Sequence, residues 1–250
     1  MRTAVVSAMR EELQALMADM ADARREMVAG REFLVGRIHG REVVAVLSRI
    51  GKVAAATTAT ALVERFAVDQ VLFTGAAGGI AEGVAVGDVV IARAFLQHDM
   101  DASPLFPRHE VPLYGRALFP TDEALSLRLG RAARDALATP DRTLGEAVVR
   151  EFALQAPKVH EGLIASGDRF VSTTQESVAL RAARPDLLAV EMEGAAVAQV
   201  CHDYGLPFAA VRTVSDRADD AAHVDFLRFI QQVASRYSHA VIDRFFRDQA

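Results

Sequence analysis

The stretch Lys52–Gly79 reads KVAAATTATALVERFAVDQVLFTGAAGG, and it sets the expected fold class. Residues Lys52–Phe66 are rich in alanine and carry few charges, which is typical of a helix buried on more than one side. Gln70–Thr74 is a short apolar run of the kind that forms a buried strand, and it leads into the glycine loop Gly75–Gly79. A buried helix followed by a buried strand predicts an α/β protein.

The rest of the chain continues this alternation. Further strands are expected at Thr3–Ala8, Arg31–Ile38, Arg41–Ser48, Asp88–Ala94, His160–Ala165, Leu187–Glu191 and Pro207–Thr213. Further helices are expected at Thr121–Ala138, Gly194–Tyr204 and Val224–Phe246. Gln97–Leu113 contains three prolines and shows no periodicity, which predicts a long loop. Because no linker divides the chain, we expect one domain, residues 1–250, built on a mixed, mostly parallel central sheet.

The composition excludes several classes of protein. Of the 250 residues, 51% are hydrophobic and 24% are charged, as in an ordinary globular protein. The formal net charge of −5 gives no overall basic surface for nucleic acid. The single cysteine, Cys201, excludes an intrachain disulfide and a multi-cysteine zinc site. The first apolar run, Ala4–Met9, is short for a secretory signal, and no run suits a membrane span, so a cytoplasmic protein is expected.

Polar residues cluster after the predicted strands, where ligand sites form in parallel sheets. In chain order they are Glu11 and Glu12; the glycine loop; Asp168, Phe170 and Val171; Glu191, Met192 and Glu193; and Arg212, Ser215 and Asp216. Several carboxylates at one rim are what general acid–base chemistry needs. One acid at a helix start, such as Glu11, is explained equally well by the helix dipole. Glu193 differs, because it follows a buried strand, where an unpaired acid is costly.

The glycine loop by itself leaves two interpretations open. It is neither a P-loop nor the GxGxxG dinucleotide fingerprint. Its glycines either permit a tight turn and close helix packing, or let backbone N–H groups approach a sugar or an anion.

Six motifs in order resemble one known family, the 5′-methylthioadenosine/S-adenosylhomocysteine nucleosidases of the nucleoside phosphorylase superfamily. The motifs are Ala8-Met9-Arg10-Glu11-Glu12, Ile50-Gly51-Lys52-Val53-Ala54-Ala55, Thr74-Gly75-Ala76-Ala77-Gly78-Gly79, Ser166-Gly167-Asp168-Arg169-Phe170, Val190-Glu191-Met192-Glu193 and Val211-Arg212-Thr213-Val214-Ser215-Asp216. The resemblance implies a three-layer α/β/α sandwich that is usually homodimeric and needs no metal or organic cofactor. It also implies hydrolysis of the N-glycosidic bond of an adenosine thioether.

The resemblance implies roles for particular residues. Asp216 matches the acid that protonates adenine N7, and Ser215 orients it. Glu12 matches the residue that positions and deprotonates the attacking water, and Glu193 matches the carboxylate that holds the ribose hydroxyls. The remaining binding residues implied are Met192 on the sugar, Arg212 near the water, Phe170 and Val171 on adenine, Ala76 and Gly78 in the glycine loop, and Met9, Ile50 and Phe226 around the thioether tail. Many family members have serine where this chain has Ala76, so one hydroxyl contact is missing.

The resemblance also implies a role for the partner subunit. In the family, a loop of the partner completes the tail pocket, and here that loop carries Ala102 and Leu105.

Three alternatives remain open at this point. A phosphorylase would use phosphate in place of water and would need fixed positive charge. The chain has Phe73-Thr74 where phosphorylases carry an arginine, although Arg10 and Arg49 remain within reach of that position. Other hydrolases of the superfamily act on futalosine-type nucleosides or on AMP. A non-catalytic nucleoside-binding protein would be expected to lack one of the three acids, and all three are present.

Overall fold

The strands lie close to the apolar runs that predict them. The computed structural model describes residues 1–154, 156–219 and 226–247, and within these ranges ten strands form one sheet. Their bounds are β1 (Arg2–Ser7), β2 (Ala21–Val28), β3 (Arg31–Ile38), β4 (Arg41–Leu47), β5 (Gln70–Gly79), β6 (Val89–Gln97), β7 (Leu118–Pro120), β8 (Val159–Ser166), β9 (Leu187–Glu191) and β10 (Phe208–Asp216). The sequence pattern does not predict β2, because most of its side chains are exposed and no apolar alternation marks it, nor does it predict the short β7.

The sheet is mixed, and part of it closes on itself. Its strand order is β10-β6-β8-β9-β5-β1-β4-β3-β2, and β10 also pairs with β5, so that the first five strands form a ring. β5 pairs in parallel with β1 and β10 and antiparallel with β9. Gly78 therefore lies opposite both Val190 of β9 and Asp216 of β10. The ring brings the ends of three strands to one place.

The glycine segment is part of a strand, which corrects the predicted loop. β5 continues past Thr74 to Gly79 and stays paired with β10 along this length. β10 likewise runs on from Thr213 to Asp216. Glycine and alanine carry no bulky side chain, and partner strands are available on both edges of the segment, so pairing continues. Arg212, Ser215 and Asp216 consequently lie within β10, whereas the sequence pattern places Ser215 and Asp216 after a strand.

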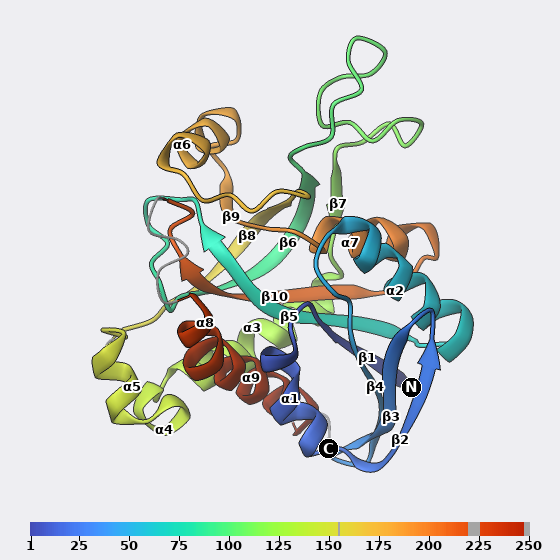
Figure 1. Cartoon of the computed structure of the whole chain (residues 1–250), viewed down its shortest axis with the longest axis vertical. Helices are drawn as coiled ribbons and strands as arrows, with labels where there is room; N and C mark the ends of the chain where they lie inside the picture. The colour runs from blue at the N-terminus through green and yellow to red at the C-terminus, as the bar shows by residue number, and fades with distance from the viewer. Residues whose placement is uncertain (155, 220–225, 248–250) are drawn as a thin grey trace.

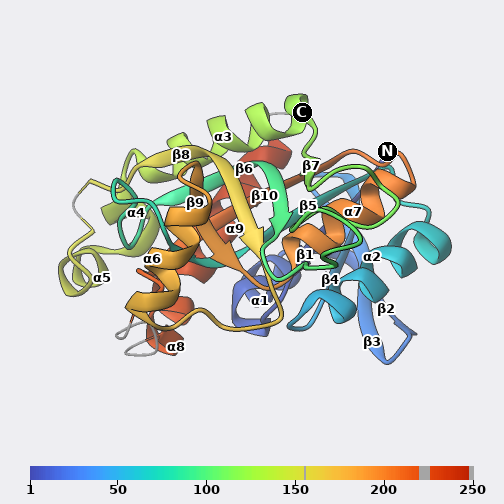
Figure 2. The same cartoon turned by 90° about the horizontal axis from the view of Figure 1, so that it is seen from above.

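Helices cover both faces of the sheet, which confirms the three-layer sandwich. Their bounds are α1 (Arg10–Ala18), α2 (Lys52–Phe66), α3 (Glu123–Leu137), α4 (Pro140–Leu144), α5 (Glu146–Glu151), α6 (Thr174–Ala183), α7 (Gly194–Asp203), α8 (Phe226–Phe229), a π-helical turn (Ile230–Ala234) and α9 (Ser235–Arg247). Successive residues of β1 face opposite layers: Val5 packs with α1, α3 and α9, whereas Ala4 and Val6 pack with α2 and α7. Figure 1 shows these two groups of helices on either side of β5 and β10, and Figure 2 shows α3 alongside β6 and β8.

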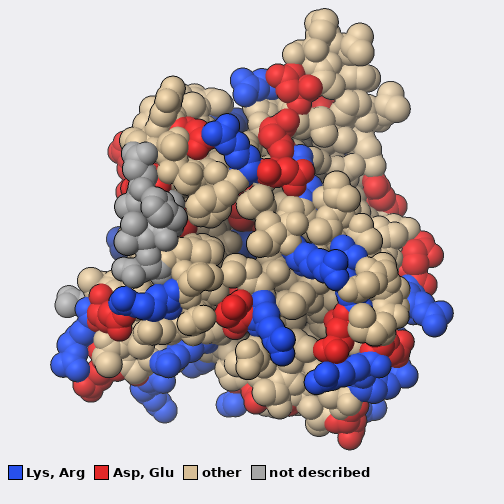
Figure 3. Space-filling view, viewed as in Figure 1, with Lys and Arg blue, Asp and Glu red and all other residues tan. Residues whose placement is uncertain are grey.

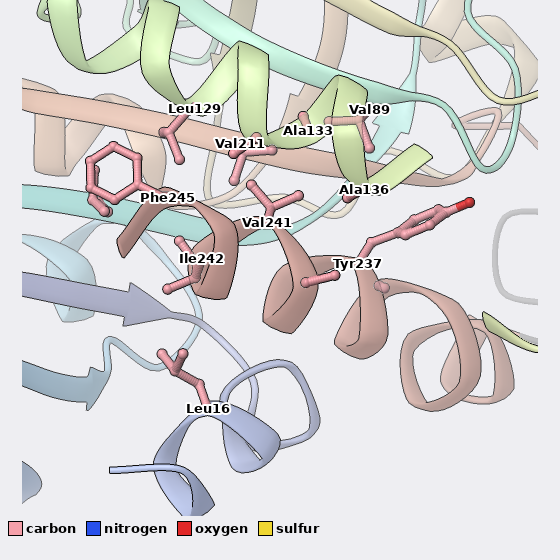
Figure 4. Packing of buried hydrophobic residues seen from close by; sticks show 14 of the residues in the cluster. Leu16, Val89, Leu129, Ala133, Ala136, Val211, Tyr237, Val241, Ile242 and Phe245 are labelled. Carbon is pink, nitrogen blue, oxygen red and sulfur yellow. The ribbon is translucent and has the colours of Figure 1, made fainter. Parts of the chain in front are cut away.

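The C-terminal helix forms the centre of one layer. Its buried residues Tyr237, Val241 and Phe245 recur at helical spacing. Figure 4 shows them facing α3 and the sheet, with Leu16 of α1 on the other side of α9. The predicted helix Val224–Phe246 is thus present from Phe226, interrupted by the π turn, and its residues 224 and 225 lie outside the described part of the chain.

Charged side chains of both signs lie on the surface. Lys, Arg, Asp and Glu side chains are interspersed over the side shown in Figure 3. None of the described helices has the length and hydropathy needed to span a bilayer. Residues 98–117, which include all of the predicted loop Gln97–Leu113 except Gln97, project from the top of the molecule in Figure 1.

Candidate active site

All predicted catalytic and binding residues line one cavity of about 170 Å³. They are Met9, Glu12, Ile50, Ala76, Gly78, Phe170, Val171, Met192, Glu193, Arg212, Ser215, Asp216 and Phe226. The cavity forms where the closed ring of strands gathers the ends of β5, β9 and β10 beside the start of α1. The structure therefore brings together side chains that lie more than two hundred positions apart in the chain.

Glu12 is buried at the first turn of α1 and is held by three donors. Its Oε2 accepts hydrogen bonds from Ser7 Oγ and from Met9 N at 3.1 Å. Its Oε1 accepts from Ala76 N at 2.9 Å. Burial raises the pKa of this carboxyl, and the Ser7 hydroxyl and the Arg212 guanidinium oppose the rise. Ser7 is not among the predicted site residues. Its only signal in the sequence is that it is the one polar residue in the apolar run Ala4–Met9.

Glu193 is the N-cap residue of α7, and it too is buried. Its Oε1 accepts a hydrogen bond from Gly51 N at 2.9 Å. Burial and the neighbouring carboxylate of Glu191 raise its pKa to about 8, although Gly51 and Arg212 act in the opposite direction. In the ligand-free protein the Glu193 carboxyl group is therefore mostly protonated at neutral pH.

Asp216 ends β10 beside the glycines of β5. Its Oδ2 accepts a hydrogen bond from Ser215 Oγ at 2.7 Å, and its Oδ1 accepts from Ala218 N at 2.8 Å. Burial raises the pKa of Asp216, and the two hydrogen bonds oppose the rise. A Cβ atom on Gly78 would lie 2.9 Å from Asp216 Oδ1, so glycine makes room for the acid.

The glycine segment makes room for two acids, which differs from both of the interpretations left open by the sequence. A Cβ atom on Gly75 would lie 3.3 Å from Glu12 Oε1, so both acids pack against glycine. The Ala76 N–H group donates to Glu12 rather than to a ligand. Close approach is the reason for glycine here, and the groups that approach are the protein's own carboxylates.

Arg212 forms a buried ion pair with Glu191, which the sequence pattern places at the predicted rim but to which the resemblance assigns no role. The two side chains meet at 2.8 Å, and Glu191 also accepts from Ser166 Oγ. The Arg212 guanidinium lies over the ring of Phe73, 4.0 Å from the ring centroid. The sequence signal for Glu191 is its place at the end of a buried strand, where an acid requires a partner.

The opposite wall of the cavity is apolar. Phe170, which is 44% exposed, packs edge-on against Phe226 with 6.0 Å between ring centroids. Met9, Ile50 and Met192 add further apolar surface. The combination of buried acids and an aromatic, sulfur-rich wall suits a ligand that is polar at one end and apolar at the other.

Several residues of the sequence analysis lie elsewhere. Glu11 and Asp168 are not among the described residues that line the cavity. Asp168 Oδ1 instead accepts from Lys52 N at 2.7 Å, which links two loops beside the site. Ala102 and Leu105 also lie away from this chain's cavity, as far as its described lining extends. Among the described residues, no group of three His, Cys, Asp or Glu side chains is placed to bind a metal ion.

The chain is similar to known proteins over almost its whole length. The family model of the phosphorylase superfamily matches residues 2–247. The 5′-methylthioadenosine/S-adenosylhomocysteine nucleosidase of Shewanella loihica is 35% identical over 244 residues, 97% of each chain. The nucleosidase of the same name from Neisseria meningitidis, solved with methylthio-immucillin-A, superposes with a TM-score of 0.86 at 33% identity over 99% of both chains. Futalosine hydrolase of Helicobacter pylori superposes with a TM-score of 0.84 at 29% identity, covering 99% of this chain and 97% of that one.

Proposed function

Since the chain belongs to the phosphorylase superfamily and, within it, to the family of the 5′-methylthioadenosine/S-adenosylhomocysteine nucleosidases, we propose that it is an N-glycosidic hydrolase of adenosine thioethers. It cleaves 5′-methylthioadenosine or S-adenosylhomocysteine with water, giving adenine and a 5-thioribose product. The observation that carries this function is the meeting of three buried carboxyl groups, Glu12, Glu193 and Asp216, in one cavity with an apolar wall.

Asp216 is the proton donor to the leaving base. Adenine leaves poorly as an anion, and protonation at N7 makes it a neutral leaving group. Burial raises the pKa of Asp216 and so favours the protonated form that can donate. Ser215 Oγ and Ala218 N hold the carboxyl group in a fixed orientation.

Glu12 and Glu193 act on the water and the sugar. Glu12 accepts a proton from the attacking water, and its raised pKa makes it a stronger base than an exposed glutamate. Glu193 accepts hydrogen bonds from the ribose hydroxyls and faces the positive charge that develops on the sugar, as in other glycoside cleavages. Donation from these hydroxyls and that charge both favour the ionised form of Glu193. Ala76 adds only a methyl group at this position, so the water lacks a side-chain donor there.

Water rather than phosphate is the expected nucleophile. A phosphate site needs unpaired positive charge. The arginines among the described lining residues are Arg169 and Arg212, and each has a carboxylate partner, Glu176 at 2.5 Å and Glu191 at 2.8 Å. Arg10 and Arg49 are not among the described residues of the lining. This distribution of charge favours hydrolysis over phosphorolysis.

The apolar wall defines the class of 5′ substituent. We assign the 5′ substituent to the part of the cavity lined by Ile50 and Phe226. Neither side chain can form an ion pair with a phosphate group, so AMP is disfavoured as the substrate. A futalosine-type nucleoside is the second candidate, because the structure of futalosine hydrolase superposes almost as well as that of the nucleosidase. A substrate panel therefore includes methylthioadenosine, S-adenosylhomocysteine, futalosine and AMP.

A homodimer completes the tail pocket in this proposal. Leu105 is 83% exposed on the projecting loop, and Ile50 at the cavity mouth is 59% exposed. A contact between the loop of one subunit and the cavity mouth of the other would cover both of these apolar side chains. We place the Ala102–Leu105 loop of each subunit against the cavity of the other.

Subunit complementation tests this arrangement. Homodimers of Leu105→Asp and of Asp216→Asn should both be nearly inactive. A mixed dimer, co-expressed with two affinity tags, contains one site with both an intact acid and an intact loop, so it should regain about half the wild-type activity. An inactive mixed dimer, or a monomer in sedimentation, would contradict the proposed dimer.

Product analysis tests the function itself. Purified protein is incubated with each nucleoside, with and without phosphate, and the base and sugar are identified by mass. Adenine with free methylthioribose, at a rate indifferent to phosphate, is expected. Methylthioribose 1-phosphate would make the protein a phosphorylase, and tight binding without adenine release would make it a binding protein.

A further inference from the structure

We propose that Glu191 is a positioning residue for Glu193: it takes up the backbone donors at the start of α7 and pairs with Arg212, and thereby leaves the Glu193 carboxyl group free to face the ligand. This inference rests on the proposed function for its kinetic consequences. Its structural part stands on the hydrogen bonds around α7.

The start of α7 is capped in an unusual way. An N-cap side chain normally accepts a hydrogen bond from the second or third backbone N–H group of its own helix. In the described structure the N-cap residue Glu193 makes no such bond. Glu191 accepts instead from Glu193 N at 3.2 Å and from Gly194 N at 2.9 Å. Ser166 Oγ accepts from Ala195 N at 2.7 Å.

Ser166 and Glu191 act as one unit. The Ser166 hydroxyl donates to Glu191 Oε1 while it accepts from Ala195 N, so a single chain of hydrogen bonds joins β8, β9 and α7. The first residue of α7, Gly194, packs directly against the ring of Phe95. A Cβ atom at this position would lie 2.2 Å from the ring, so only glycine fits there. The donors that would draw the Glu193 side chain back to its helix are therefore already occupied.

Glu191, and not Glu193, also forms the ion pair with Arg212. Arg212 and Glu191 are both almost fully buried, and their ion pair measures 2.8 Å. Because Glu191 takes this cation, Glu193 keeps a single hydrogen bond in the described structure, from Gly51 N. Most of its acceptor capacity stays available for the hydroxyl groups of a ligand.

The protonation of Glu193 supports this assignment. The ionisable groups that face it are Glu191 of β9, Arg212 of β10 and Glu12 of α1. Burial, followed by the charge of Glu191, raises its pKa to about 8. Removing the charge of Glu191 removes a like charge and releases Arg212, and both changes lower the pKa of Glu193.

Two variants distinguish the effect of the Glu191 charge from the effect of its side-chain length. Glu191→Gln keeps the length of the side chain and loses the charge. Glu191→Asp keeps the charge and is too short to reach the α7 donors and Arg212 together. Glu161→Gln is the matched control. Like Glu191, Glu161 forms ion pairs with arginine, in its case Arg93 and Arg134, but it is not among the described residues that line the cavity. Each protein is tested for the pH dependence of its melting temperature, which needs no activity, and for the pH profile of kcat/KM.

We expect different results from the two variants. The wild-type melting temperature should fall as the pH rises from 5 to about 8, and in Glu191→Gln this fall should end at least about one pH unit lower. The rising limb of kcat/KM should move by the same amount. Glu191→Asp should keep the wild-type limb and lose about 10²-fold in kcat/KM, since Glu193 is misplaced. Glu161→Gln should resemble the wild type from pH 5 to 8 in both measurements.

The outcomes also separate this inference from the proposed function. If the wild type releases no adenine, the function fails and the melting profiles still decide the role of Glu191. Melting profiles of Glu191→Gln and wild type that run in parallel would overturn the inference. If Glu191→Gln does not fold, Glu191→Asp decides: wild-type kcat/KM in that variant would overturn it.

Discussion

Replacement of Glu193 by glutamine should stabilise the ligand-free protein at neutral pH while it removes activity. Glu193 is buried, and its pKa rises from 4.5 to about 8 on folding. Between these values the unfolded chain releases the proton and the folded protein keeps it. Wild-type stability is therefore fully present below pH 4.5 and declines as the pH rises to about 8.

The size of the effect follows from the shift in pKa. The decline is about 1.4 kcal/mol per pH unit, which amounts to about 3 kcal/mol at pH 7. Glutamine does not titrate, and its carbonyl oxygen can still accept the hydrogen bond from Gly51 N. Glu193→Gln should therefore melt roughly 6–12 °C above the wild type at pH 7, and the two should converge below pH 4.5.

Thermal unfolding of the ligand-free proteins at pH 5, 6, 7 and 8 measures this difference. One protein concentration is used throughout, because melting of a dimer depends on concentration. Glu11→Gln is the matched control, since Glu11 neighbours the site but is not among the described residues of the cavity lining, and its curve should follow the wild type. A constant difference between Glu193→Gln and wild type from pH 5 to 8 would refute the reasoning.

Three further predictions concern the proposed mechanism. Asp216→Asn removes the proton donor and keeps its shape, so kcat should fall by about 10²–10⁴-fold while the Kd for adenine changes little; turnover near the wild-type value would exclude Asp216 as the acid. Gly78→Ala should lower kcat by about 10-fold or more, because its Cβ would lie 2.9 Å from Asp216 Oδ1 and displace it; Gly83→Ala, where no described atom lies within 4 Å, should be neutral, and equal effects of the two would contradict the steric explanation. Phe170→Ala removes the ring proposed to stack on adenine and should raise KM by about 10-fold with a smaller change in kcat, whereas an unchanged KM would place the base elsewhere.

Burying the carboxyl groups of the site costs folding free energy, and the structure shows which of them have a compensating charge. The ion pair with Arg212 compensates the buried charge of Glu191, whereas burial raises the pKa values of Glu12, Glu193 and Asp216. Among these, Glu193 has a pKa of about 8 and can hold a proton near neutral pH. The segment Glu191–Glu193 thus holds one carboxylate in a buried ion pair and one carboxyl group with a raised pKa.

Local pattern was enough to predict most of the elements and the family. The helix Lys52–Phe66 and the strands Arg31–Ile38 and Leu187–Glu191 have the predicted bounds, because burial on a helix or strand face leaves a periodic pattern in the chain. The six motifs pointed to the family that the comparisons confirm. They also named the residues that the structure gathers around one cavity, whose individual roles stay predictions.

Other features depend on contacts between segments far apart in the chain, and only the tertiary structure decided them. The glycine segment continues β5 because β9 and β10 pair with its two edges. The roles of Ser7 and Ser166 cannot be predicted from the local sequence, since each acts through a carboxylate from another element. Glu191 and Glu193 are two residues apart, of the same type, and both line the cavity, yet Glu191 pairs with Arg212 whereas burial raises the pKa of Glu193 to about 8. Sequence shows which groups are present, but the burial and partners that fix their charge arise only when the strands close into a ring.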